Sequence, residues 1–308
     1  MKNQTFGIEI EMNGILRTKA AAVIAAYFGT TASRPSMGCY HTQTIPTPDG
    51  REWKVMRDSS IPGPDDEKTE VVSPICRWED IETVQALVRE LRKAGAKTNP
   101  AKCGIHVHIG LGNHTAKTLR NLVNIVNAKE DLLTQALDID PERRDEWCKP
   151  VDQHFLERLN RAKPTQMDAL AKLWYNTDNW VYRAHEHYDH SRYHLLNLHA
   201  VWQKGTIEFR AFNGTLHAGE IKAYIQLCMA ISHKALTSKS ASPIRPVTDN
   251  PKYAFRCWLL QLKLIGAEFA TARHHLLANL PGNAAWRNGA PTQRQGSDAH
   301  RDDENRDE

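Results

Sequence analysis

Residues 103–110 have the sequence CGIHVHIG, in which aliphatic side chains alternate with His106 and His108. Successive side chains of a β-strand point to opposite faces of the sheet. The run therefore places an aliphatic row on one face and two imidazoles on the other. We predict a strand whose one face packs in the core and whose other face carries ionisable groups.

Two further runs repeat this alternation with charged side chains. Residues 6–12 (FGIEIEM) carry Glu9 and Glu11 in alternation with Ile8 and Ile10, and the run TIEFRAF carries Glu208 and Arg210. Two residues along a strand span about 6–7 Å, a spacing that suits two metal ions. Taken alone, the two glutamates are more typical of a solvated strand face than of a metal site. We predict that the three runs are neighbouring strands of one sheet, which would gather their ionisable groups on one face.

The composition is that of a globular protein with a sizeable core. The chain has 308 residues, of which 41% are hydrophobic and 25% are charged, and no Pro/Gly/Ser-rich linker divides it. We predict one domain over residues 1–285, within which residues 142–190 form a cap or insertion-like segment. Residues 286–308 are expected to form a disordered polar tail, because they are rich in Asp, Arg, Gln and Asn.

Charge and cysteine usage exclude several classes of function. The net charge of +4 is spread along the chain, so no nucleic-acid partner is expected. The six cysteines form no CxxC pair, which argues against a zinc ribbon or a redox motif. No secretion signal and no apolar run of about 18 residues is apparent, so we expect a cytoplasmic protein without a membrane partner.

Apolar periodicity predicts helices that cover one side of the sheet. A β-hairpin is expected where residues 193–202 precede the TIEFRAF strand after a short turn. Further strands are expected at residues 52–57 and 69–73. The predicted helices span residues 19–28, 79–94, 119–137 and 218–236, with a helical pair at 253–277.

The ionisable residues of these strands are rich in carboxylates. Glu70 in the EVVSP run adds another acid to the strand glutamates, and Arg210 adds a permanent cation. Hard oxygen ligands with an occasional imidazole suit Mg²⁺ or Mn²⁺ better than zinc. An arginine near such a site suits a phosphoryl group in transfer.

Five motifs in this order resemble the amidoligases, a branch of the carboxylate–amine ligases with a fold like that of glutamine synthetase and glutamate–cysteine ligase. The resemblance spans most of residues 5–236. It implies an α+β fold in which a curved, mainly antiparallel sheet carries helices on one face and an open, concave active site on the other. The motifs are FGIEIEM, WKVMRDSS, EVVSPI, CGIHVHIG and RYHLLNLHAVWQKGTIEFRAFNGT.

The resemblance also implies a reaction and a set of site residues. The reaction is ATP- and Mg²⁺-dependent (or Mn²⁺-dependent) formation of an amide or isopeptide bond through an acyl phosphate. His108 is expected to face the nucleotide phosphates, and Arg210 to contact the transferred phosphoryl group. The metal ligands that it implies are Glu9, Glu11, Glu70, His106 and Glu208.

Two further residues of the matching motifs are candidates for catalysis. Arg192 is expected to bind a phosphate or the substrate carboxylate. Asp58, which ends the WKVMRD run, could orient or deprotonate the incoming amine, although an aspartate before two serines is also an ordinary turn residue. The five histidines of residues 185–199 lack a fixed zinc spacing, and we expect a polar rim there and no metal site.

Alternative functions also follow from these residues. A metal-dependent hydrolase or phosphotransferase could use the same carboxylate and histidine face without consuming ATP in a ligation. A binding module with a decayed site is a third possibility, which the presence of all the matched acidic, His and Arg positions disfavours. The carboxylate and amine substrates stay open: a small amino acid or polyamine, a peptide or protein carboxylate, or a cell-wall or other modified substrate. The oligomeric state is not predicted.

Overall fold

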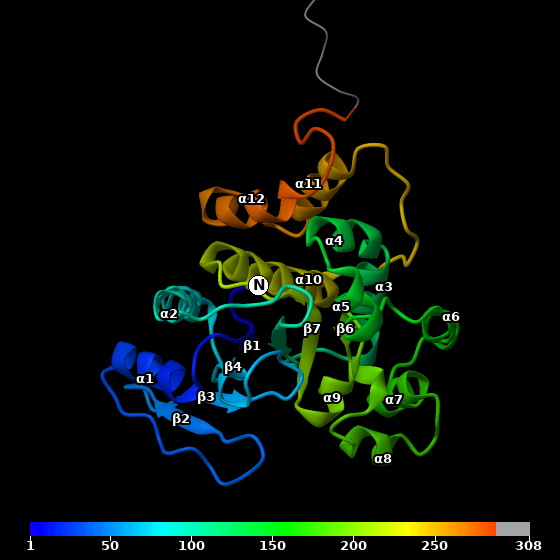
Figure 1. Cartoon of the computed structure of the whole chain (residues 1–308). Helices are drawn as coiled ribbons and strands as arrows, with labels where there is room; N and C mark the ends of the chain where they lie inside the picture. The colour runs from blue at the N-terminus through cyan, green and yellow to red at the C-terminus, as the bar shows by residue number, and fades with distance from the viewer. Residues whose placement is uncertain (288–308) are drawn as a thin grey trace, which may run out of the picture.

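An open, curved antiparallel sheet organises the chain (Figure 1). The computed structural model describes residues 1–287, and the seven strands found there follow the order β2-β3-β4-β1-β5-β7-β6. With helices packed against this sheet, the fold class is α+β, as predicted. The strands are β1 (Phe6–Met12), β2 (Gln43–Pro46), β3 (Glu52–Arg57), β4 (Thr69–Val72), β5 (Gly104–Gly110), β6 (Leu196–Asn197) and β7 (Thr206–Asn213).

The three alternating runs are neighbours at the centre of the sheet, which confirms the prediction. Strand β1 pairs with β4 on one side and with β5 on the other, and β5 pairs in turn with β7. The aliphatic rows of β1 and β5 are completely buried. One face of the sheet therefore packs in the core, and the ionisable residues lie together on the other.

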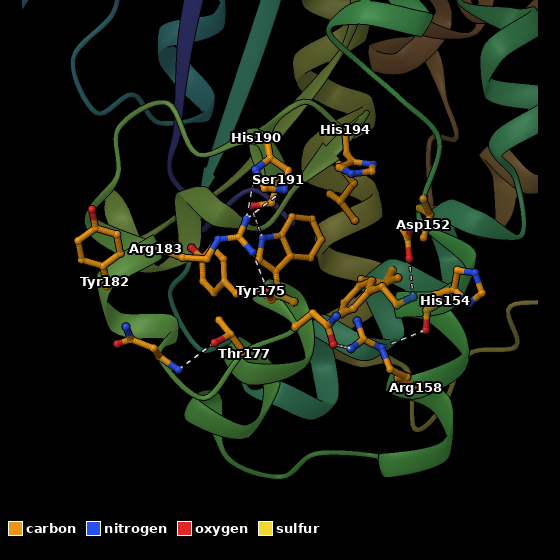
Figure 2. A pocket seen from close by; sticks show the side chains of 17 residues that line it. Asp152, His154, Arg158, Tyr175, Thr177, Tyr182, Arg183, His190, Ser191 and His194 are labelled. Atoms are coloured by element: carbon orange, nitrogen blue, oxygen red, sulfur yellow. Dashed lines mark hydrogen bonds between the residues drawn. The ribbon is translucent and has the colours of Figure 1, made fainter.

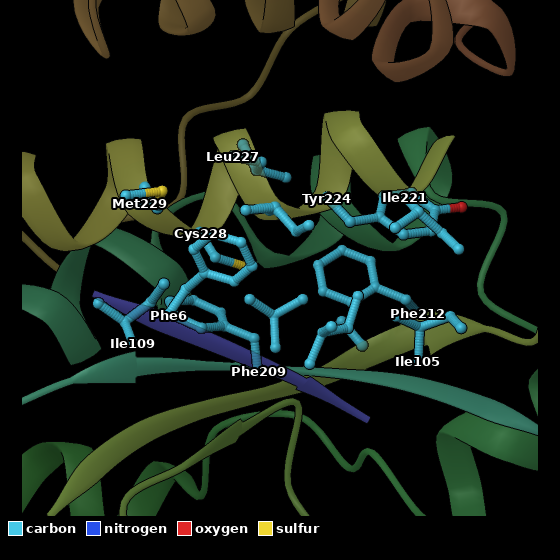
Figure 3. Packing of buried hydrophobic residues seen from close by; sticks show 14 of the residues in the cluster. Phe6, Ile105, Ile109, Phe209, Phe212, Ile221, Tyr224, Leu227, Cys228 and Met229 are labelled. Carbon is cyan, nitrogen blue, oxygen red and sulfur yellow. The ribbon is translucent and has the colours of Figure 1, made fainter. Parts of the chain in front are cut away.

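Helix α10 covers the apolar face of the central strands (Figure 3). Phe212 of β7 stacks on Tyr224 of α10 with ring centroids 4.3 Å apart. Ile105 and Ile109 of β5 point toward the same helix (Figure 3). The α-helices are α1 (Arg17–Phe28), α2 (Ile81–Lys93), α3 (Ala116–Asn127), α4 (Glu130–Ala136), α5 (Pro141–Glu146), α6 (Gln153–Ala162), α7 (Met167–Tyr175), α8 (Trp180–His185), α9 (His199–Gln203), α10 (Ala218–Thr237), α11 (Pro251–Gln261) and α12 (Ala270–Ala278).

A second helical layer lies on the far side of α10. Helices α11 and α12 pack there, so α10 is sandwiched between the sheet and this pair (Figure 1). Helices α2 and α3 flank α10, and α1 packs against β2 and β3. Helix α1 ends at Gly29, whose φ of 67° is the left-handed conformation that glycine adopts without strain. The helices predicted at the two ends of the chain are thus found.

The prediction of one continuous helix over residues 119–137 is wrong. It breaks into α3 and α4 at Lys129, whose backbone (φ −121°, ψ 6°) is not helical. The amide side chains of Asn124 and Asn127 donate to the carbonyls of Ala241 and Pro243. The last turns of α3 thus contact a distant loop, and the apolar periodicity does not show the break that follows.

The hairpin predicted before β7 is largely wrong. Strand β6 contains two residues, and the chain then turns into α9. The side chain of Asn197 directs this turn, because its Oδ1 accepts the backbone N–H of His199 at 2.8 Å and its Nδ2 donates to Glu208 at 2.6 Å. A side chain that bonds to the backbone two residues ahead competes with strand pairing.

Four short helices, α5 to α8, form most of the segment expected to be a cap. They lie beside the β6 end of the sheet (Figure 1). Asp140 caps α5 and Pro141 opens it, so this proline begins a helix. The single domain at residues 1–285 stays a prediction, and the predicted tail lies outside the described residues from residue 288 on. Among the described helices, none has the length and apolarity that a membrane crossing requires.

Candidate functional site

The polar face of β1, β4, β5 and β7 gathers the predicted metal ligands. Glu9 lies opposite His106, Glu11 lies opposite Glu70, and His108 lies opposite Glu208. Residues that are directly paired in an antiparallel sheet point to the same face, about 5 Å apart. The strand register therefore converts three separate sequence patterns into one cluster.

Glu9 lies at the centre of this cluster. One carboxylate oxygen lies 3.0 Å from Nδ1 of His106, and the other lies 3.2 Å from Nε2 of His108 and 3.1 Å from Nζ of Lys204. Burial would raise the pKa of Glu9. Nevertheless, the imidazole of His108, the hydrogen bond from His106 and the ammonium of Lys204 together hold it well below its usual value. Glu9 is thus an anion that joins both imidazoles.

Glu208 is paired with Arg210 inside the site. Nη1 of Arg210 donates to Oε1 of Glu208 at 2.5 Å, while Asn197 donates to the second oxygen. Burial opposes ionisation of Glu208, but the charge of Arg210 keeps its pKa below the usual value. The pKa of Arg210 is raised, since Glu208 and Glu9 outweigh the effect of burial. This buried pair is consequently charged.

A β-bulge in β7 makes this arrangement possible. The partner of Ile105 is Phe212 and the partner of Val107 is Phe209, so β7 has one extra residue opposite His106. Strict alternation after Arg210 would have placed Phe212 on the polar face. The bulge turns the Phe212 ring into the core and leaves Arg210 in the site.

The acids at the other end of the cluster have too few positively charged neighbours to balance their negative charge. Ligand oxygens of Glu11, Asp58 and Glu70 lie within 4.8 Å of one another. Burial is the largest cause that raises the pKa of Glu11, to about 7, and the nearby Asp58 adds to it. Burial and the neighbouring Glu9 and Glu11 raise the pKa of Glu70 well above its usual value. A divalent cation is what this donor set fits, because it would relieve that repulsion.

The groups that could hold an ion overlap on the sheet face. Glu9 is shared by the two groups that contain imidazoles, and Glu70 is shared by one of these and by the group of Glu11 and Asp58. The structure thus brings every predicted ligand together, and their role as ligands stays a prediction. Besides the Glu11 group, the groups are Glu9 with Glu70 and His106, and Glu9 with His108 and Glu208.

Arg143 is a site residue that the sequence did not reveal. It is 2% exposed, and its Nη2 donates at 3.3 Å to Nε2 of His106 and at 3.3 Å to the backbone carbonyl of Arg210. A Cβ atom at Gly104 would lie 2.0 Å from this Nη2, so only glycine leaves room for the guanidinium. Arg143 comes from α5, which has no motif of its own. The glycine that precedes the IHVHI run is the one local hint.

Both ring nitrogens of His106 are engaged in this arrangement. Nδ1 carries the proton donated to Glu9, and Nε2 accepts from Arg143. Burial and the charge of Arg210 lower the pKa of His106 to about 4. His106 is therefore neutral at pH 7, the form in which imidazole binds a metal, and its one lone pair, on Nε2, accepts from Arg143.

Two cavities meet at Glu9, on opposite sides of the cluster. One, of about 370 Å³, is lined by the acids and by Asp58, Arg192 and Arg210. The other, of about 410 Å³, is lined by His108, Lys204, Thr206 and several backbone glycines. The face is therefore open to ligands from two directions.

Arg192 and Asp58 both border the first cavity, but they are held differently. Arg192 donates to the carbonyl of His187 at 2.9 Å and lies near the rings of Tyr188 and Tyr193. Asp58 accepts from the N–H and the hydroxyl of Ser60. The turn that we considered for Asp58 is thus present, and its carboxylate still faces the acids of the site.

A larger cavity lies elsewhere, among helices α6 to α8 (Figure 2). It has a volume of about 880 Å³ and contains Trp174, Arg183 and His190 in its wall. Arg183 is fully engaged, donating to both oxygens of Asp189. Ionisable groups do not converge here as they do on the sheet, so the sheet face is the stronger candidate.

The histidine-rich run of residues 185–199 is dispersed. His194 bonds to the carbonyl of Pro150 at 2.7 Å, and His199 lies 2.6 Å from the hydroxyl of Tyr175. Within the described residues, no histidine of this run belongs to a group close enough to hold an ion. The expectation that the run is not a metal site stays a prediction.

Comparison with known proteins identifies a family. A family model described as "Putative amidoligase enzyme" matches residues 2–232, which include every site residue named above. The search of curated proteins gives no match. The matched region ends within α10, so α11 and α12 lie beyond it.

Proposed function

This chain belongs to the amidoligase family, whose name indicates an amide-bond-forming ligase, and we propose that it joins a carboxylate to an amine with consumption of ATP. The observation that supports this best is the excess of buried carboxylates on the sheet face. Four glutamates lie there. The raised pKa values of Glu11 and Glu70 indicate that the neighbouring cations do not balance the negative charge of all four. Mg²⁺ or Mn²⁺ would supply the missing charge and hold nucleotide phosphates.

The proposed reaction needs no protein nucleophile. A carboxylate reacts poorly with an amine, so transfer of the terminal phosphoryl group of ATP to the carboxylate first forms an acyl phosphate. The amine then attacks the acyl carbon, and inorganic phosphate leaves as the amide forms. Both steps move negative charge onto phosphoryl oxygens, which fixed cations stabilise best when they are already in place.

Arg210 has the position for this role. Its pairing with Glu208 through Nη1 fixes the guanidinium, while its buried Nε has no hydrogen-bond partner among the described residues. A buried donor without a partner is costly unless a ligand oxygen occupies it. We assign this donor to the transferred phosphoryl group.

The two cavities supply separate places for the substrates. Lys204, His108 and the glycine backbone of the second cavity offer donors to nucleotide phosphates. Arg192 in the first cavity would bind a phosphate or the carboxylate of the acid substrate, and Asp58 would orient the amine and accept its proton. The cluster around Glu9 lies between them, where phosphoryl transfer would occur.

ATP turnover with pooled substrates tests this proposal. The purified protein would be incubated with ATP, Mg²⁺ and pools of amino acids, polyamines and peptides, and ADP and condensed products would be followed by mass spectrometry. The ligase predicts ADP release that requires a carboxylate and an amine together, with product mass equal to their sum less water. Glu208→Gln should abolish it, whereas Glu52→Gln, on the exposed side of β3, should not.

The opposite result is equally specific. Phosphoester cleavage without ATP would favour the metal-dependent hydrolase or phosphotransferase, because the same acids could activate water. ADP release that is independent of both pools would count against a ligase. Full turnover by Glu208→Gln would remove this glutamate from the site.

A further inference from the structure

A second group of metal-ligating side chains lies on the helical side of the protein, away from the sheet face. It consists of His217, Glu220 and His275, whose ligand atoms lie within 4.8 Å of one another. His217 is the N-cap of α10, Glu220 is in its first turn, and His275 is on α12. We propose that these three side chains bind one Zn²⁺ ion.

The space between the two imidazoles is shaped by a missing side chain. A Cβ atom at Gly219 would lie 2.6 Å from Nε2 of His275 and 3.3 Å from Nδ1 of His217. Both ring nitrogens thus lie close to Gly219, where any side chain would contact them. Glycine disfavours a helix, yet here the absence of a side chain leaves room for the two imidazoles beside the helix.

The donor set distinguishes this group from the cluster on the sheet. Two imidazoles and one carboxylate suit zinc, with water as the fourth ligand, whereas the sheet face is mainly carboxylate. The hydroxyl of Thr215 donates to Oε2 of Glu220 at 2.6 Å, which orients this carboxylate as an outer partner orients a metal ligand.

The three ligand atoms lie within reach of one ion, since they are at most 4.8 Å apart. Zinc–nitrogen bonds of about 2.1 Å place donor atoms about 3.4 Å apart, so the side chains need to approach by at most about 1.4 Å. The lone pair of His217 Nδ1 accepts the backbone N–H of Glu220 at the long distance of 3.3 Å. Zinc would replace this weak cap.

An ion at this position would connect two parts of the chain. His217 and Glu220 lie in the region that the family model matches, while His275 lies beyond residue 232. Helices α10 and α12 pack against each other (Figure 1). Bound zinc would hold the second helical layer onto the layer that covers the sheet, without taking part in the proposed ligation.

Zinc binding by the full chain tests the proposal. The protein would be stripped with a chelator and titrated with Zn²⁺ against a chromophoric competitor, and its thermal midpoint would be measured with and without zinc. Wild type and His274→Ala should bind one more zinc than His275→Ala and His217→Ala. His274 is the matched control, because it is exposed and belongs to no ligand group of the described residues.

The variant Gly219→Ala distinguishes loss of the zinc site from loss of the folded structure. Alanine favours the helix but fills the space between the nitrogens. This variant should lose the same zinc equivalent, and the zinc-dependent rise of the midpoint, while staying folded without metal. Zinc bound at the sheet face contributes equally to every variant, so the difference in stoichiometry between variants does not include it. The proposal is overturned if the ligand variants keep the wild-type stoichiometry and affinity, or if His274→Ala loses zinc equally.

Discussion

Replacing Glu11 by glutamine is expected to stabilise the metal-free protein at alkaline pH. The Glu11 side chain is buried beside Glu70 and Asp58, and its carboxylate accepts the backbone N–H of Gly104 at 2.6 Å. A glutamine carbonyl can keep this hydrogen bond, while the neutral amide removes the repulsion between the acids. The substitution therefore changes the charge of the site with little change of shape.

The pKa of Glu11 gives the expected magnitude and its sign. Burial raises this pKa from 4.5 to about 7, which corresponds to about 3 kcal/mol at about 1.4 kcal/mol per unit. Between these two pH values the folded protein holds a proton that the unfolded chain has released, so stability falls as pH rises. Below about pH 4.5 the acid is neutral in both states and this destabilisation is absent.

Urea denaturation in EDTA at pH 4.5 and pH 8 provides the assay. Relative to wild type, Glu11→Gln should gain about 3 kcal/mol of unfolding free energy at pH 8 and almost none at pH 4.5. Glu52→Gln, on an exposed position of β3, controls for the loss of a negative charge and should show no such pH-dependent gain. Mg²⁺ at about 100 times its dissociation constant should stabilise wild type by about 2.7 kcal/mol, and Glu11→Gln by much less.

A particular result would refute this reasoning. If Glu11→Gln is less stable than wild type at pH 8 in EDTA, the ionised carboxylate is stabilised in the folded protein. The nearby guanidinium of Arg143 would then outweigh burial, and the site would not lack positive charge. The main support for a divalent cation on this face would be lost as well.

Two further predictions concern the arginines of the site. Gly104→Ala should lower the unfolding free energy by about 1–3 kcal/mol in urea denaturation, because its Cβ would overlap the buried Arg143, and an unchanged value would contradict the packing described. Gly7→Ala on the adjacent strand is the control, since its Cβ would meet nothing closer than 3.8 Å. Arg210→Gln should cost about 3–5 kcal/mol and abolish ATP turnover, because Glu208 would remain buried without its cation; a variant of normal stability would show that Glu208 is not ionised there.

Local alternation was enough to predict the central strands and their two faces. The side-chain period of a strand is two, so Glu9, His106 and Glu208 are assigned to a polar face without knowledge of their neighbours. Helix positions followed from apolar periodicity in the same way. The predictions failed at the break before α4, and at Asn197, where a side chain that bonds to the nearby backbone turns the chain.

The candidate site was predictable as a set of residues and not as a geometry. The motifs identified the acids, both histidines and Arg210, but the bulge in β7 that keeps Arg210 in the site depends on packing of Phe212 against α10. Arg143 could not be found at all, since a buried arginine from a short helix has no local pattern. Its position depends on contacts far apart in the sequence.

For this protein, the amino-acid order by itself determined which side chains face the core and which kinds of ligand the polar face can bind. Those properties depend on residue chemistry and on the fixed periods of strands and helices. Only the tertiary structure decided that Glu9 bridges the two histidines and that Glu11 has a raised pKa. Strand register sets these distances, and electrostatic free energies depend on distance and burial, which no local pattern contains.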